Sequence, residues 1–167
     1  MPEKIVGLPP VIAENSRVLI LGSMPSVLSL SHQEYYGNPR NHFWKIIFGL
    51  FDATPIEKYE EKIEFVIQRG IALWDTIGTC YRDGSLDSAI TDEEPNDIPK
   101  LINDFRSVQL VACNGTKSFN TLNKYYSSEE LSNLPVIRLP SSSPIPGRFN
   151  KTLEEKLEIW KQILSYI

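Results

Sequence analysis

Side chains that donate or accept hydrogen bonds gather directly after four short apolar runs of the sequence. Asp75 follows the run at 71–74, and Asn114 follows the run at 108–113. Three consecutive serines occupy 141–143, in a stretch that carries no acidic residue. Carboxyl and amide groups can read the polar edge of a ligand, and hydroxyl groups without nearby negative charge suit contact with a phosphate. These positions are therefore the candidates for the chemistry of the chain.

The elements that must position these side chains alternate along the chain. Apolar runs without polar alternation predict strands buried on both faces, at 17–21, 71–74, 108–113 and 136–139. Helical spacing of apolar residues predicts helices around 43–51, 63–67, 116–126 and 152–167. Strand–helix alternation is typical of the α/β class, here a three-layer α/β/α sandwich with a central four-stranded, mainly parallel sheet in a single domain, 1–167. Ligands of such sheets bind outside the carboxyl ends of the strands, where the polar segments stand.

Two helix starts have recognisable sequence signals. Thr152 and Glu155 have the spacing of a capping box, so they predict the start of the last helix. Asn38 followed by Pro39 matches an N-cap with proline at the first helical position. That second signal predicts a helix that begins at Pro39 and places Asn41 in its first turn.

The composition excludes several classes of protein. Hydrophobic residues make up 41% of the 167 residues and charged residues 23%, which is ordinary for a globular protein. No apolar run approaches the roughly 18 residues of a membrane span, and the first ten residues lack the pattern of a signal peptide. We therefore expect a cytoplasmic protein that does not contact a membrane.

Metal-free chemistry is expected as well. Cys80 and Cys113 are the two cysteines, too few for an iron–sulfur cluster and too far apart in sequence for a Cys-x-x-Cys pair. His32 and His42 do not stand in a zinc-type spacing with other ligands. The sequence thus predicts no metal and no cofactor.

The net charge of −4 argues against a nucleic-acid partner, but its distribution weakens the objection. The stretch 138–151 carries Arg138, Arg148 and Lys151 and no acid. A locally positive face on an acidic protein is sufficient for weak binding to DNA.

The sequence of one long segment resembles the sequences of a known family. The turn GSMPS at 22–26, followed by YYGNPRNHFW at 35–44, resembles motif one of the uracil-DNA glycosylase superfamily and is closest to its hypoxanthine-DNA glycosylase branch. The resemblance implies a monofunctional DNA N-glycosylase of base excision repair. Such an enzyme flips a deaminated base, here hypoxanthine (deoxyinosine), out of double- or single-stranded DNA and hydrolyses its N-glycosidic bond. We expect it to act as a monomer.

Base-binding residues follow from this resemblance. The superfamily stacks the flipped base on an aromatic ring of this loop, and Tyr36 is the predicted ring. Asp75 stands where uracil enzymes read the pyrimidine edge, and its carboxylate can accept a hydrogen bond from N1–H of hypoxanthine; capping of the turn after a strand is the other interpretation. The turn Gly22, Ser23 and Met24 completes the predicted base-binding set. Met24 occupies the position of the acid or amide that activates or orients water in better-known members, and a thioether cannot do either.

The polar work of catalysis is therefore assigned to asparagines. Asn41 and Asn114 are the leading candidates, and Asn38 is the third. Each has a structural alternative, because asparagine caps helices and favours turns before glycine. For Asn41 we favour the catalytic interpretation, because a first-turn side chain can reach the crevice.

The segment LPSSSPIPGRFN resembles motif two of the superfamily, which grips the phosphates beside the flipped nucleotide. Ser141, Ser142 and Ser143 are predicted to contact phosphate, Ile145 to fill the vacated base stack, and Arg148 to reach a phosphate. Leu139 stands where the motif often has a histidine or asparagine. A plain connecting loop, rich in proline and serine, is the alternative.

Other functions remain open on the sequence alone. The substrate of a glycosylase could instead be uracil, xanthine or a mismatched base. A different class would be a nucleotide- or nucleic-acid-binding α/β domain without catalysis. The sequence contains neither G-x-G-x-x-G nor a Walker motif, and it lacks the G-x-S-x-G elbow of a serine hydrolase.

Overall fold

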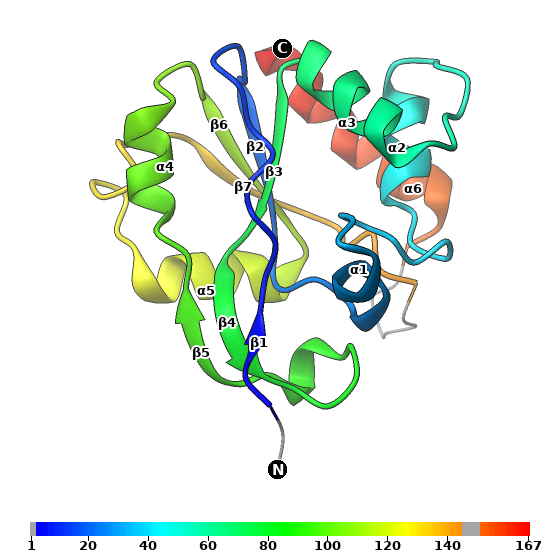
Figure 1. Cartoon of the computed structure of the whole chain (residues 1–167). Helices are drawn as coiled ribbons and strands as arrows, with labels where there is room; N and C mark the ends of the chain where they lie inside the picture. Colours follow the sequence, from blue (N-terminus) through cyan, green and yellow to red (C-terminus); the bar gives the residue numbers. More distant parts are fainter. Residues whose placement is uncertain (1–2, 145–150) are drawn as a thin grey trace.

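A sheet of four parallel strands forms the centre of the protein (Figure 1). The computed structural model describes residues 3–144 and 151–167. The strands lie in the order β3, β2, β6, β7 and span Ile71–Asp75, Val18–Gly22, Leu110–Asn114 and Val136–Leu139. All three pairings are parallel. The four predicted strands are confirmed, with boundaries that differ by at most two residues.

Helices cover both faces of this sheet, because its strands are apolar on both sides. On one face Val18 and Ile20 of β2 belong to a core shared with α2 (Phe43–Leu50), α3 (Tyr59–Gln68) and α6 (Leu153–Trp160). On the other face Leu19 and Leu21 pack with α4 (Ile98–Asp104) and α5 (Thr116–Tyr125). The alternation along β2 divides the interior into two cores and confirms the predicted three-layer arrangement.

A second, smaller sheet extends the carboxyl end of β3 and was not predicted. Its antiparallel strands β1, β4 and β5 span Ile5–Val6, Ile77–Tyr81 and Thr91–Pro95. β5 has the sequence TDEEP, which is polar and at least partly exposed along its length, so no hydrophobic periodicity marks it. Only one residue, Thr76, separates β3 from β4, so the sequence showed no boundary between the two strands.

The predicted start of α2 at Pro39 is wrong. The helix begins at Phe43, and residues 38–42 form a turn that two asparagine side chains stabilise. Asn38 Oδ1 accepts a hydrogen bond from the backbone N–H of Arg40 (2.9 Å), and Asn41 Oδ1 accepts one from the N–H of Phe43 (2.9 Å). Asparagine often bonds to the backbone two residues further on, and this local turn competed successfully with the helix.

The start of α6 is as predicted. Thr152 accepts a hydrogen bond from the N–H of Glu155, whose side chain accepts one from the N–H of Thr152, so the capping box is complete. Three helices were not predicted, namely α1 (Val27–His32), η1 (Asp87–Ala89) and α4. The predicted helix at 152–167 is divided between α6 and a 3-10 helix, η2 (Lys161–Tyr166). No helix within 3–144 and 151–167 is long and apolar enough to cross a membrane.

Candidate functional site

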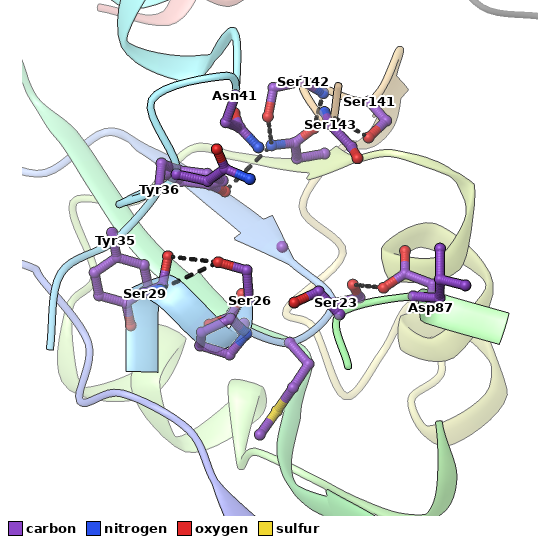
Figure 2. A pocket seen from close by; sticks show the side chains of 18 of the residues that line it. Ser23, Ser26, Ser29, Tyr35, Tyr36, Asn41, Asp87, Ser141, Ser142 and Ser143 are labelled. Atoms are coloured by element: carbon purple, nitrogen blue, oxygen red, sulfur yellow. Dashed lines mark hydrogen bonds between the residues drawn. The ribbon is translucent and has the colours of Figure 1, made fainter. Parts of the chain in front are cut away.

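A pocket of about 400 Å³ opens at the carboxyl ends of β2, β3 and β6 (Figure 2). This is the edge at which parallel sheets bind ligands, and the volume falls in the usual range for small molecules, about 300–1,000 Å³. One wall is the segment 140–144 after β7, which we call the serine loop. The pocket brings together eleven of the predicted site residues, namely Gly22, Ser23, Met24, Tyr36, Asn38, Asn41, Asp75, Asn114, Ser141, Ser142 and Ser143.

Asp75 is the last residue of β3 and its carboxyl group is almost completely buried beside the pocket. Its exposed fraction is 4%, and Oδ2 has no hydrogen-bond partner within the described residues. Burial, together with the smaller effect of the negative charge of Asp87, raises the pKa of Asp75 to about 7, and Arg82 opposes the shift. Buried polar atoms are normally hydrogen-bonded, so Oδ2, which is buried and has no partner, marks Asp75 as a candidate for binding a ligand at the pocket that it lines.

Gly22, at the end of β2, is required by the close approach of two site residues. A Cβ at this position would overlap Asp75 Oδ1 and would lie 3.3 Å from the hydroxyl of Tyr36. The absence of a side chain at residue 22 therefore allows Asp75 and Tyr36 to lie at the same place in the pocket.

The two adjacent tyrosines have different roles. The hydroxyl of Tyr35 donates to the backbone oxygen of Pro9 (2.7 Å), and the residue is buried in the core. Tyr36 adopts a left-handed backbone conformation (φ 55°), and its ring lines the pocket with its centroid 6.4 Å from that of the Tyr35 ring. The ring stacks on Phe43, with centroids 3.8 Å apart and planes 18° apart. Phe43 therefore fixes the orientation of an aromatic wall.

Asn41 points a hydrogen-bond donor away from its own backbone. Only the oxygen of an amide can accept from the N–H of Phe43, so the Asn41 Nδ2 group must face the other way. The described residues supply no hydrogen-bond partner for Nδ2, and Asn41 lines the pocket. Because the oxygen is already occupied, the arrangement favours a donor role for Asn41 over that of an acceptor that holds a water molecule.

Asn114, at the end of β6, uses both ends of its amide to hold neighbouring groups. Its Oδ1 accepts from the N–H of Ser142 (2.9 Å), and its Nδ2 donates to Ser142 Oγ (2.9 Å) and to the hydroxyl of Tyr36 (3.2 Å). Figure 2 shows these contacts between the aromatic wall and the serine loop. Asn114 thus fixes the geometry of the pocket rather than presenting a free amide to it.

The turn after β2 is held by residues that the sequence analysis left unassigned. Ser23 Oγ donates to Asp87 Oδ1 (2.7 Å), and Arg82 Nη2 donates to the backbone oxygen of Pro25 (2.5 Å). Met24 is 7% exposed and packs against Ile77 while it lines the pocket. Residues 85–88 form a further wall. The sequence analysis did not assign these residues, because nothing in their sequence indicates which strand end they would face.

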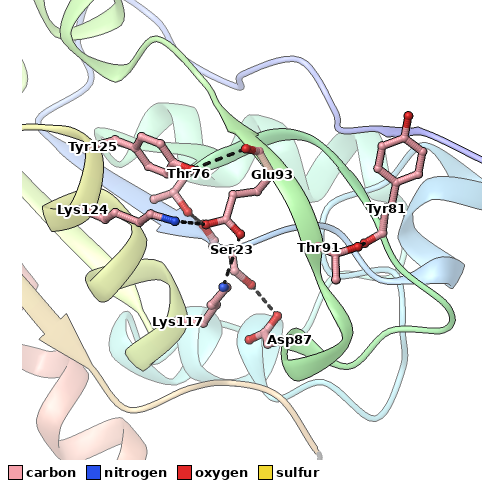
Figure 3. A network of polar contacts seen from close by, with 10 residues as sticks. Ser23, Thr76, Tyr81, Asp87, Thr91, Glu93, Lys117, Lys124 and Tyr125 are labelled. Carbon is pink, nitrogen blue, oxygen red and sulfur yellow. Dashed lines mark hydrogen bonds and ion pairs between the residues drawn. The ribbon is translucent and has the colours of Figure 1, made fainter.

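The small sheet is tied to α5 by one acidic residue (Figure 3). Glu93 of β5 lies 3.2 Å from Lys124 Nζ and 3.6 Å from Lys117 Nζ, and its backbone oxygen accepts from the Tyr125 hydroxyl (3.4 Å). The side chain of Glu93 is only 11% exposed, and its pKa is lowered by the two lysines against the opposing effect of burial. This contact fixes the sheet from which the 85–88 wall projects.

Two of the predicted DNA-binding residues, Ile145 and Arg148, lie outside the described residues. Of the other predicted phosphate contacts, Ser141 is exposed, whereas Ser142 is buried by its contacts with Asn114. Within the described parts of the chain no group of three or more histidine, cysteine or carboxylate side chains is arranged to hold a metal ion. The polar side chains that line the pocket are amides, hydroxyls, the buried carboxyl of Asp75 and the exposed carboxyl of Asp87.

Comparison with known proteins gives a consistent result. The profile of the uracil DNA glycosylase superfamily matches residues 9–164. A protein of Methanosarcina acetivorans named hypoxanthine DNA glycosylase is 37% identical over 153 residues, which cover 91% of this chain and 94% of that protein. A protein of the same name from Methanosarcina barkeri is 39% identical over 114 residues, covering 67% of this chain and 72% of that protein. A solution NMR structure from Methanosarcina acetivorans, described as a candidate uracil DNA glycosylase, is 33% identical, with a TM-score of 0.78 over 97% of this chain and 99% of that one.

Proposed function

Because the chain belongs to the uracil DNA glycosylase superfamily, we propose that it removes hypoxanthine from DNA as a single-domain, monofunctional glycosylase. The family match confirms the resemblance and the enzyme class that the sequence predicted. The observation that carries the choice of base is the unpaired buried carboxyl of Asp75 beside the aromatic wall of Tyr36. The names of the two Methanosarcina relatives support the same base.

Recognition of the base would combine stacking with two hydrogen bonds. The ring of Tyr36 offers a π-face to any flipped base, so it supplies affinity and little selectivity. Ionised Asp75 accepts from N1–H of hypoxanthine, and the Nδ2 group of Asn41 is a donor for an acceptor atom of the base. Adenine lacks the N1–H donor, so the carboxylate also discriminates against the parent base.

Hydrolysis breaks the bond between N9 of the purine and C1′ of the deoxyribose. Water adds to C1′ as a hydroxyl group, and the proton that it loses balances the one that the departing base takes up. Positive charge develops on the sugar and negative charge on the departing base. A fixed donor such as Asn41 Nδ2 stabilises the negative charge without reorganising during the reaction. Met24 lines the pocket without offering a proton acceptor, so the reaction relies on stabilising the leaving base more than on activating water.

A strand-cleavage assay tests the function directly. Duplexes with one hypoxanthine, uracil or xanthine are incubated with the protein, and the abasic product is cleaved with alkali. We expect cleavage at hypoxanthine to be the fastest. Faster cleavage at uracil or xanthine would change the assigned base. No cleavage at any of the three would contradict the proposed glycosylase activity.

The same assay tests the monofunctional mechanism. No lysine is found among the described residues that line the pocket. We therefore expect no cleavage before alkali is added and no covalent adduct with DNA in the presence of borohydride. A trapped adduct would reveal a Schiff base and would contradict hydrolysis by water.

Replacing Gly22 by alanine should lower activity strongly. The new Cβ would overlap Asp75 Oδ1, so the carboxyl must move away from the base. Loss of a hydrogen bond to a charged group costs about 1.5–3 kcal/mol, so kcat/KM should fall by roughly 10- to 100-fold. Gly7→Ala is the matched control, because a Cβ there would meet only ordinary contacts of 3.4 Å or more. Equal activity of the two variants would show that the position of Asp75 is unimportant.

The other parts of the assignment stay predictions. A monomer in the cytoplasm, without a cofactor, is the arrangement that the sequence favours. The serine loop is proposed to grip the DNA backbone, with Ser141 as its exposed hydroxyl.

A further inference from the structure

Two side chains of α6 donate hydrogen bonds to backbone oxygens of the serine loop. Trp160 Nε1 donates to the backbone oxygen of Pro140 (2.9 Å), and Lys156 Nζ donates to that of Ser143 (3.5 Å). The two residues lie one turn apart on α6 and so reach the same segment. His42 also holds the loop. Its backbone N–H donates to the backbone oxygen of Ser142 (2.9 Å), and its ring Nδ1 lies 3.1 Å from Lys156 Nζ.

Lys156 is an unusual residue for this purpose. It is only 1% exposed, yet no carboxylate forms an ion pair with it within the described residues, and the segment 145–150 contains no acid. Burying an ammonium group without a counter-charge is unfavourable, because the group loses its hydration. A neutral donor would anchor the loop as well, as Trp160 does from the next turn.

Two lysines and one acid act on His42, the neighbour of Lys156. Lys156 and Lys45 of α2 favour the neutral form of His42, whereas Glu154 opposes them. The pKa of His42 is lowered by burial first and by Lys156 second. The serine loop itself contributes no acid, so the positive charge of Lys156 acts on whatever lies over the loop.

We propose that Lys156 is a positioning residue that holds the serine loop and supplies the positive charge with which that loop binds a DNA phosphate. The proposal rests on the proposed function only in taking DNA as the substrate. The phosphate provides the counter-charge that the protein does not provide for Lys156. Binding therefore gains from a charge whose burial weakens the free protein.

Binding of an undamaged duplex at several salt concentrations tests this. In Lys156→Met the slope of log affinity against log salt should fall by about one, and affinity at 0.1 M salt should fall roughly tenfold. Lys156→Gln keeps a hydrogen-bond donor but removes the charge, so it should show the same change. Lys161→Met is the matched control, because Lys161 is an exposed lysine that pairs with Glu158, and its slope should be that of the native protein.

The outcomes separate charge from simple support of the loop. Thermal unfolding at or above the native temperature, together with a reduced slope, is the expected result for Lys156→Met. A native slope in both variants, or a loss of affinity in Lys156→Met that Lys156→Gln restores, would overturn the proposal. Because the duplex contains no damaged base, this result can be read even if the native protein fails to cleave at hypoxanthine.

Discussion

Asn41→Ala should reduce the rate of hypoxanthine removal by about 100- to 1,000-fold, which is the usual effect of removing one fixed donor that stabilises developing negative charge. The Asn41 oxygen is occupied by the N–H of Phe43, so the amide cannot rotate without losing that bond. Its Nδ2 group therefore faces the pocket before any base enters. The measurement is the single-turnover rate at saturating enzyme, which reports the chemical step.

Asn41→Ser is the control that separates catalysis from folding. Serine can still accept a hydrogen bond from Phe43 N–H, but it has no amide donor to direct at the base. We expect Asn41→Ser to be as slow as Asn41→Ala, whereas only the alanine variant should lose about 1 kcal/mol of stability. Near-native activity of Asn41→Ser would contradict the donor role. Retained activity in both Asn41→Ala and Asn114→Ala would contradict the site as a whole.

The sequence was sufficient to predict the large sheet because its strands follow one simple rule. Residues buried on both faces must be apolar, and VLILG of β2 has no other interpretation at that length. The small sheet obeys no such rule. Its strand β5 is acidic and is fixed by contacts of Glu93 with two lysines more than 20 residues away in sequence, which no local pattern records.

The functional site was likewise predictable only in part. Strand ends placed Asp75 and Asn114 at one edge of the sheet, and the family resemblance supplied Tyr36 and Asn41. The function of each side chain depended on contacts that sequence does not contain. Asn114 was predicted to do polar work in catalysis, but its amide is engaged with Ser142 and Tyr36. Asn38 was given a helix cap as its alternative role, but it stabilises the turn to Arg40.

The second large effect is a dependence of activity on pH that Asp75 controls. Burial and, to a smaller extent, the charge of Asp87 together raise the pKa of this carboxyl to about 7. Only the ionised form can accept a hydrogen bond from N1–H of hypoxanthine. We therefore expect kcat/KM to fall about tenfold for each pH unit below 7 and to level off above it. Asp75→Asn has no proton to gain, so its activity should not vary with pH over this range.

Stability should change in the opposite direction, which provides an independent test. A carboxyl whose pKa is higher in the folded state than its ordinary value of 3.8 binds its proton more tightly when folded. Its favourable contribution is complete below pH 4 and is lost as the pH rises to about 7, so the free energy of unfolding should decrease over the range in which activity increases. Asp75→Asn should remove both slopes together. Activity that falls as the pH rises through 7 would instead show that protonated Asp75 is the working form and that it donates to the base.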